Sequence, residues 1–221
     1  MRNILLCSAA LALTVSAAEA QDGGYNWSGF YAGVQAGYGR LQSDFSGTNA
    51  IPSGQESEDG FVGGVYVGHD WQSGNFVFGA LADLDYLDTD NIGLEGIFNG
   101  KDEAYNYDVD WMATARVRAG FLPMDNILVY GTGGLAMARV ETSGSRETFG
   151  PTFSFDDSEV EIGGAIGAGV EVALTPKWSI KTEYLHYEFN DSEIDVGLGD
   201  NPTFNPSADT VKVGLTFRLG Q

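Results

Sequence analysis

The sequence YDVDWMATARVRAGF, residues 107–121, alternates between apolar and polar side chains. From Val109 to Phe121 every odd-numbered residue is apolar, whereas Asp110, Arg116 and Arg118 occupy even-numbered positions. Successive side chains of a β-strand point to opposite faces, but a helix would distribute these charges around its axis. The stretch therefore predicts a long β-strand with one apolar face and one charged face.

The same alternation recurs along the chain, and charged side chains again keep to one face of each segment. These segments exceed the roughly 5–6 residues of an ordinary strand and match the about 9–11 residues with which a tilted strand crosses a bilayer. We expect eight such strands, at residues 27–39, 60–71, 76–87, 107–121, 127–141, 159–174, 178–189 and 209–219.

The connections between these segments alternate in length. Three are short: Gln72–Asn75, Leu122–Asn126 and Thr175–Lys177. Four are long and polar: 40–59, 88–106, 142–158 and 190–208. Short turns at one rim and long loops at the other are typical of outer-membrane barrels. The expected fold is all-β, an eight-stranded antiparallel up-and-down transmembrane β-barrel with short periplasmic turns and long extracellular loops.

The two faces of the strands distinguish a membrane barrel from a soluble one. A soluble barrel places its bulky apolar face inside, whereas a membrane barrel turns that face to lipid. Here the charged face carries most of the glycines, which leave room for long charged side chains but cannot fill an interior. Because an eight-stranded lumen is only wide enough to be filled by side chains, the charges are expected to pair inside it. The expected ionic cluster comprises Asp83, Asp85, Asp110, Arg116, Arg118, Glu171, Lys181, Glu183, Lys212 and Arg218.

Aromatic residues also sort by strand direction if the N-terminus lies in the periplasm. The periplasmic rim is expected to hold Trp27, Trp71, Tyr130 and Trp178. The opposite rim is expected to hold Tyr38, Tyr86, Tyr107 and Phe189. Two such girdles flanking an aliphatic band are typical of membrane barrels, because aromatic rings favour the interface.

Composition and the first residues indicate an exported protein. The chain has 221 residues and a formal net charge of −20, which argues against a nucleic-acid partner. Residues 1–20 have the layout of a secretory signal peptide, with Arg2 before an apolar core and a small-x-small cleavage site before Gln21. Residues 21–221 are expected to form one outer-membrane β-barrel domain. The only cysteine, Cys7, lies in the predicted signal peptide.

Three stretches resemble a known family: NWSGFYAG at 26–33, LVYGTGGLA at 128–136, and GAGVE at 167–171 followed by WSIKTEY at 178–184. They are similar to the porin-like outer-membrane proteins of alphaproteobacteria, the opacity-type branch of the OmpA-like transmembrane barrels. The resemblance covers 21–221 and implies an outer-membrane location and insertion by the barrel assembly machinery. The C-terminal pattern that this machinery recognises matches Lys212, Gly214, Phe217 and Leu219. The family usually ends on an aromatic residue, whereas here Leu219 is followed by Gly220-Gln221.

The sequence offers no residues for catalysis, a cofactor or a metal centre. It has two histidines, His69 and His186, and neither has a serine two residues away, as a lipid-acyl hydrolase on one strand face would place it. His69 and Asp70 are consecutive, so a regular strand points them to opposite faces. The glycine run 163–169 opens no helix and is interpreted as a strand rather than a phosphate loop. We therefore expect a protein that is not an enzyme.

The leading functional hypothesis is a structural, surface-exposed barrel of the cell envelope whose partners are outer-membrane lipid, lipopolysaccharide and the assembly machinery. One alternative is a narrow porin-like channel for small solutes or ions. Another is a surface protein that binds an extracellular ligand such as haem, or a host surface. Its contacts would be the loop aromatics Phe149, Phe153, Phe155 and Phe204. The acidic loops also suggest divalent cations shared with lipopolysaccharide phosphates, although no Asp-x-Asp-x-Asp-Gly calcium loop occurs.

Overall fold

The computed structural model describes residues 25–46, 54–89, 92–98, 101–146, 153–189, 192–193 and 203–219. Its strands are β1 (Gly29–Ser46), β2 (Gly54–Ser73), β3 (Phe76–Thr89), β4 (Ile92–Phe98), β5 (Lys101–Met124), β6 (Ile127–Arg146), β7 (Phe153–Ala173), β8 (Trp178–Phe189), β9 (Ser192–Glu193) and β10 (Thr203–Arg218). Within this described part, no helix is long and apolar enough to cross a membrane.

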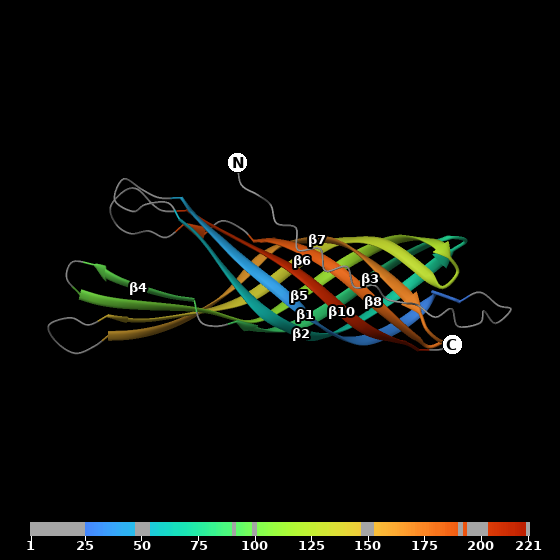
Figure 1. The fold of residues 1–221 in the computed structure, drawn as a ribbon, viewed down its shortest axis with the longest axis horizontal. Coiled ribbons are helices and arrows are strands. Elements are labelled where there is room, and N and C mark those ends of the chain that lie inside the picture. Colours follow the sequence, from blue (N-terminus) through green and yellow to red (C-terminus); the bar gives the residue numbers. More distant parts are fainter. Residues whose placement is uncertain are drawn as a thin grey trace.

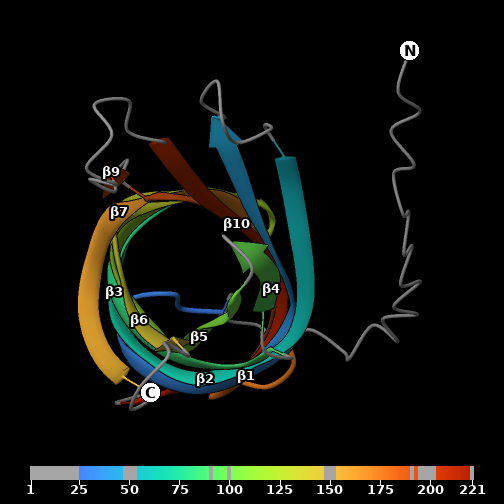
Figure 2. The same cartoon turned by 90° about the vertical axis from the view of Figure 1, so that its left-hand side faces the viewer.

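Eight strands close into a barrel. Neighbours pair in the order β1-β2-β3-β5-β6-β7-β8-β10, and β10 pairs with β1 to complete the ring. All of these pairings are antiparallel. Viewed along the long axis, the tilted strands form a ring (Figure 2), and their crossing is seen from the side in Figure 1. The predicted eight-stranded antiparallel barrel is confirmed.

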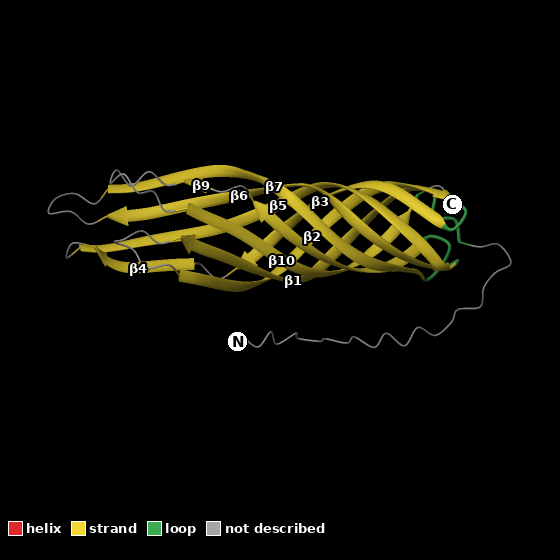
Figure 3. Cartoon of the chain, turned by 90° about the horizontal axis from the view of Figure 1, so that it is seen from above, coloured by secondary structure: helices red, strands yellow, loops and turns green. Residues whose placement is uncertain are grey.

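One end of the barrel carries short turns. The β2–β3 turn consists of Gly74 and Asn75, the β5–β6 turn of Asp125 and Asn126, and residues 174–177 connect β7 to β8. Gly74 adopts a φ of 59°, in the left-handed region that suits a residue without a Cβ. These turns lie together at the end that also holds the C-terminal strand end (Figure 3), as the connection lengths predicted.

The opposite end differs from the expectation of long loops. β1 and β2 remain paired as far as Phe45 and Gly54, and β6 and β7 as far as Arg146 and Phe153. β4 adds a hairpin partner to the start of β5. These extensions project beyond the ring at the left of Figure 1. The backbone ladder of these extensions continues although the sustained period-two pattern that predicts a strand ends before them.

Burial alternates along every barrel strand whose side chains are described. Large apolar side chains cover the outer wall, including Phe30, Val117 and Ile166. Inside, two apolar clusters occupy the two ends of the lumen. The cluster at the turn end contains Trp27, Val77, Leu122, Leu128 and Tyr130. The cluster at the opposite end includes Val62, Leu87, Met112, Leu185 and Tyr187. The space between these clusters is where the charged side chains lie.

Candidate functional site: the filled lumen

Among the residues whose side chains the structure describes, ten charged side chains are buried within the barrel, five carboxylates and five cations. They are Asp70, Asp83, Asp85, Arg116, Arg118, Glu171, Lys181, Glu183, Lys212 and Arg218. Each comes from an inward position of β2, β3, β5, β7, β8 or β10, so the alternation of the strands delivers them to one space. A burial this deep is tolerated only when charges compensate one another.

The charges nearer the turn end form what we call the periplasmic layer: Asp70, Arg118, Glu171 and Arg218. Arg118 donates to Asp70 through Nε at 2.9 Å and through Nη2 at 2.5 Å, and its Nη1 donates to Glu171 Oε2 at 2.9 Å. Arg218 Nη2 lies 3.0 Å from Asp70 Oδ2 and 3.5 Å from Glu171 Oε1. Two guanidinium groups thus bridge the same two carboxylates, a geometry for which the planar arginine fork is suited.

The remaining six form the extracellular layer: Asp83, Asp85, Arg116, Lys181, Glu183 and Lys212. Arg116 Nη2 donates to Asp83 Oδ2 at 2.6 Å and to Glu183 Oε1 at 3.0 Å. Lys212 Nζ donates to Asp85 Oδ2 at 2.5 Å. Lys181 Nζ is 3.9 Å from Glu183 Oε1 and 3.5 Å from the centroid of the Tyr66 ring, a cation–π contact. Each acid of this layer therefore has a cation beside it.

Tyrosine side chains connect the two layers. The Tyr130 hydroxyl donates to Glu183 Oε2 at 2.9 Å, and the Arg118 guanidinium lies 5.1 Å from the centroid of the Tyr130 ring. Arg118 also lies 4.7 Å from the ring of Tyr31. The lumen is consequently occupied by a continuous network rather than by two separate groups of ion pairs.

Inward glycines make room for this network. A Cβ on Gly64 would collide with a carboxylate oxygen of Asp85, and a Cβ on Gly79 would collide with one of Asp70. Outward Gly131 differs, because the nearest neighbour of a Cβ there would be the Gly167 carbonyl oxygen at 3.9 Å. Gly64 and Gly79 are thus required by close packing against charged side chains, whereas Gly68 and Gly169 make room for the rings of Tyr31 and Tyr130.

The structure places nine of the ten expected cluster residues together in the lumen. The tenth, Asp110, lies where side chains are outside the described part, next to a register irregularity between Val109 and Trp111. Asp70 was missed by the sequence analysis. It is the only acidic residue in 60–71 and is the second-last residue of that expected strand, so it resembles a turn residue. The sequence did contain one indication that Asp70 faces inward: it has the same even numbering as Tyr66, which is buried in the lumen.

The expected aromatic girdles need correction. Trp71, Trp178, Tyr38 and Tyr86 are exposed on the outer wall, as expected. Trp27, Tyr130 and Phe189 are instead buried inside the barrel. Strand direction determines at which rim a residue lies, but successive side chains of a strand point to opposite faces. A residue at a rim can therefore face either the lipid or the lumen. The side chain of Tyr107 lies outside the described part.

The expected assembly pattern lies on the last strand. Lys212 and Gly214 face the lumen, whereas Leu219 is exposed on the outer wall. The Phe217 ring packs against Trp178 with centroids 4.9 Å apart. The pattern therefore presents its apolar members to the membrane side.

Both histidines lie on the outer wall of the barrel. His69 packs between Phe30 and Trp71 on the outer wall, while Asp70 points inward. His186 Nδ1 lies 2.9 Å from Asp209 Oδ1 at the partly exposed wall. Among the residues that the structure describes, no three His, Cys, Asp or Glu side chains converge as metal ligands. The expected ligand-contacting aromatics lie outside the described part (Phe149) or in strand backbone whose side chains are not described (Phe153, Phe155 and Phe204).

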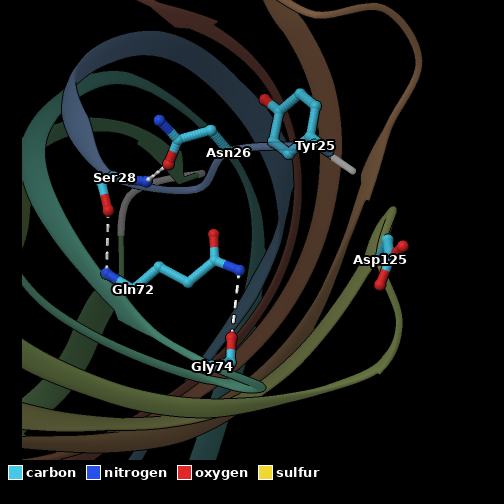
Figure 4. Close-up of a pocket in the computed structure, with 6 residues that line it drawn as sticks. All are labelled: Tyr25, Asn26, Ser28, Gln72, Gly74 and Asp125. Atoms are coloured by element: carbon cyan, nitrogen blue, oxygen red, sulfur yellow. Dashed lines mark hydrogen bonds between the residues drawn. The ribbon is translucent and has the colours of Figure 1, made fainter. Parts of the chain in front are cut away.

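The surface of the described part of the barrel has hollows at the turn end and on the outer wall. One, of about 380 Å³, lies at the periplasmic mouth and is lined by Tyr25, Asn26, Ser28, Gln72, Gly74 and Asp125 (Figure 4). The other is an apolar depression of about 560 Å³ on the outer wall over Ala80 and Ala82. The polar groups of the first are hydrogen-bonded among themselves: Gln72 N donates to Ser28 Oγ at 3.0 Å, and Gln72 Nε2 donates to the Gly74 carbonyl at 3.1 Å.

A closed antiparallel barrel with an apolar wall and a charged interior defines a transmembrane β-barrel protein. Residues 7–218 match the family model of the outer membrane protein beta-barrel domain. The chain belongs to this family, and it is a protein of the Gram-negative outer membrane.

Relatives agree with this assignment. The chain is 31% identical over 210 residues to a 31 kDa outer-membrane immunogenic protein of Brucella melitensis, covering 88% of this chain and 85% of the relative. It is 29% identical over 196 residues to a 22 kDa outer membrane protein of Rhizobium leguminosarum, covering 88% and 79%. A crystal structure of a major outer membrane protein from Thermus thermophilus aligns with a TM-score of 0.50 at 12% identity, over 83% of this chain and 99% of that one. This last likeness concerns the fold.

Proposed function

We propose that the protein is a non-enzymatic, non-conducting barrel that anchors its strand extensions at the cell surface and contributes to envelope integrity. The observation that carries the proposal is the filled lumen: ten buried charges in ion-paired contact, with apolar clusters at both ends. An ion crossing this space would have to displace paired charges in a region of low dielectric, which is costly. The barrel then serves as an anchor rather than as a conduit.

Planar-bilayer recording tests the absence of conduction. The protein is refolded, its insertion is verified by the different gel mobility of unheated and heated samples, and current is recorded. We expect no steady open-channel steps. The matched variant replaces a whole ion pair, Arg116→Ser with Glu183→Ser, which preserves the charge balance while removing side-chain volume. Steps in this variant alone support the proposal; equal steady steps in the unmodified protein would establish the narrow channel instead.

Surface presentation is tested with single cysteines in a chain whose Cys7 lies in the predicted signal peptide. Ser145→Cys places a thiol on the extension of β6, and Ser73→Cys places one at the turn end of β2. A membrane-impermeant maleimide added to intact cells is expected to label Ser145→Cys but not Ser73→Cys. Permeabilising the outer membrane should then allow both to react. Labelling of both in intact cells, or of Ser73→Cys alone, would contradict the proposed orientation.

The proposed partners are outer-membrane lipid, lipopolysaccharide and the barrel assembly machinery. The last rests on the pattern formed by Lys212, Gly214, Phe217 and Leu219 at the end of β10. Because the family usually ends in an aromatic residue, Leu219→Phe with residues 220–221 removed is expected to insert faster than the unmodified chain, and Phe217→Ala more slowly. Pulse-labelling of insertion measures both rates. Unchanged rates in both variants would remove the assembly role from this pattern.

A further inference from the structure

Residues Tyr25–Ser28 belong to no strand, yet they lie at the turn end of the barrel with Trp27 buried inside it. Trp27 is 0% exposed and packs in a cluster with Val77, Leu122, Leu128 and Tyr130. A tryptophan that anchored the barrel in the membrane interface would instead face lipid, as Trp71 does at 56% exposure. Trp27 therefore has a role inside the lumen.

Every polar group of Trp27 has a partner, and the partners are far apart in the sequence. Its backbone N–H donates to Gln72 Oε1 at 2.8 Å, and its indole Nε1–H donates to the Asp125 carbonyl at 3.0 Å. Its carbonyl accepts from Arg218 Nη1 at 2.5 Å. These residues belong to β2, to the β5–β6 turn and to β10. The docking site for Trp27 thus exists only when strands from the beginning, middle and end of the barrel are assembled.

Arg218 connects this segment to the periplasmic layer. Its Nε donates to the Tyr25 hydroxyl at 3.0 Å, and its guanidinium lies 4.9 Å from the Trp27 ring and 5.7 Å from the Tyr25 ring. Its remaining nitrogen contacts Asp70 and Glu171. Arg218 is also the last residue of β10, which pairs with β1 across the closing seam of the ring. One side chain therefore joins the N-terminal segment, the seam and the buried ionic network.

We propose that Tyr25–Ser28 is a periplasmic clasp: it docks into the lumen only once the barrel has closed, seals the periplasmic mouth, and holds the β1–β10 seam shut. The seam joins the first and last strands, so it pairs the parts of the barrel most distant in sequence, and loop closure makes such contacts entropically the most expensive. A segment that binds only the closed ring stabilises that ring relative to an open sheet by mass action. Figure 4 shows the hydrogen bond between Gln72 N and Ser28 Oγ, which ties the last residue of the clasp to β2.

The seal is tested by the reactivity of a thiol behind the clasp. Ser179 is fully buried and donates to Glu171 Oε1 at 2.5 Å in the periplasmic layer. In the full-length mature chain refolded in detergent micelles, Ser179→Cys is expected to react slowly with a small maleimide. Adding Trp27→Ala should accelerate the reaction at least about tenfold, because protection depends on the free energy of local opening. The control Trp71→Ala, at the same rim but on the outer wall, should change the rate less than about twofold.

Equal labelling rates with and without Trp27 would overturn the seal. If Trp27→Ala does not fold, Trp27→Phe keeps an aromatic ring but loses the indole donor to the Asp125 carbonyl, so an intermediate acceleration is expected. Double variants test whether the clasp holds the seam. Trp27→Ala is expected to accelerate unfolding, and this acceleration should be smaller in a chain that already carries Arg218→Met, because the two residues contact each other. Independent effects of the two substitutions would show that Trp27 packs in the mouth without holding the seam.

Fluorescence quenching distinguishes a tryptophan inside the lumen from one that faces lipid. A chain retaining only Trp27 is compared with one retaining only Trp178, the other tryptophans being replaced by phenylalanine. In vesicles with brominated acyl chains, Trp178 is expected to be quenched strongly, whereas Trp27 should resist both brominated lipid and aqueous acrylamide. Quenching of Trp27 by brominated lipid to the extent seen for Trp178 would place it in the membrane interface and refute the clasp.

Discussion

The two ionic layers inside the barrel use the same kinds of side chain but pair them to different degrees. In the periplasmic layer both cations are arginines, and both carboxylates receive several hydrogen bonds. In the extracellular layer two of the three cations are lysines. Lys181 lies 3.9 Å from Glu183, whereas Lys212 donates to Asp85 at 2.5 Å and lies 3.9 Å from Asp83. A guanidinium binds in a planar fork, whereas an ammonium acts as a compact point charge. The first layer is therefore cross-linked by two arginine forks, and the second relies on one arginine fork and two point charges.

Several buried polar atoms have no hydrogen-bond partner in the described part of the protein. Asp83 Oδ1, Gln35 Oε1 and Thr210 Oγ1 lie at or near the extracellular layer, whereas the Tyr31 hydroxyl belongs to a ring 4.7 Å from Arg118 of the periplasmic layer. Buried polar atoms of this kind are usually satisfied by internal water. Water in the extracellular layer would screen its charges, whereas the periplasmic layer is closed by Trp27 and its apolar neighbours. We expect stability to depend more on the periplasmic layer.

The largest contrast is expected between Arg118→Met and Lys181→Met, each of which removes one buried cation. Arg118→Met leaves Asp70 and Glu171 without three charge-assisted hydrogen bonds and should lower the free energy of unfolding by about 3–5 kcal/mol. Lys181→Met should lower it by only about 1–2 kcal/mol, the scale of a desolvated cation–π contact, because Glu183 keeps Arg116 and Tyr130. Urea unfolding in lipid vesicles, followed by gel mobility, measures both. Equal losses would show that the layers are equivalent.

A smaller contrast is expected between an inward and an outward glycine. In Gly79→Ala the new methyl group collides with Asp70 and lies 3.2 Å from Arg118 Cγ, so we expect a loss of about 1–3 kcal/mol. In Gly131→Ala the nearest atom is at 3.9 Å on the outer wall, and stability should be unchanged or gain up to about 1 kcal/mol. The same unfolding assay applies. Tolerance of Gly79→Ala would mean that the periplasmic layer has room to relax.

The smallest difference in stability is expected between substitutions of two buried threonines in the extracellular half, Thr114 and Thr210. Thr114 Oγ1 donates to Asp83 at 2.6 Å and accepts from Arg116 Nε at 2.8 Å, so Thr114→Val should cost about 1–3 kcal/mol. Thr210 Oγ1 has no partner in the protein, so Thr210→Val should change stability by less than about 0.5 kcal/mol. A comparable loss in Thr210→Val would indicate that a bound water holds this hydroxyl firmly, and would make the extracellular layer tighter than its protein contacts suggest.

Much of the barrel could be predicted because a membrane imposes a simple rule on each strand. The alternation around Arg116 and Val117 identified both faces, and the short connections located the turns. The strand extensions were predicted as loops, because these stretches are polar and do not sustain the alternation that marks the barrel strands. Asp70 and Trp27 were misplaced for a related reason: each stands at the end of a segment, where a few residues cannot establish a face.

The sequence by itself determined the strand count, the direction of each face and the balance of charges that a closed lumen requires, since these follow from a periodicity of two and from the solvent on either side. Tertiary structure alone decided which charges pair. Arg118 reaches Asp70 and Glu171 from strands 48 and 53 residues away, and Arg218 meets Trp27 across 191 residues. Such partners are set by the stagger and curvature of the closed ring, which no local pattern encodes.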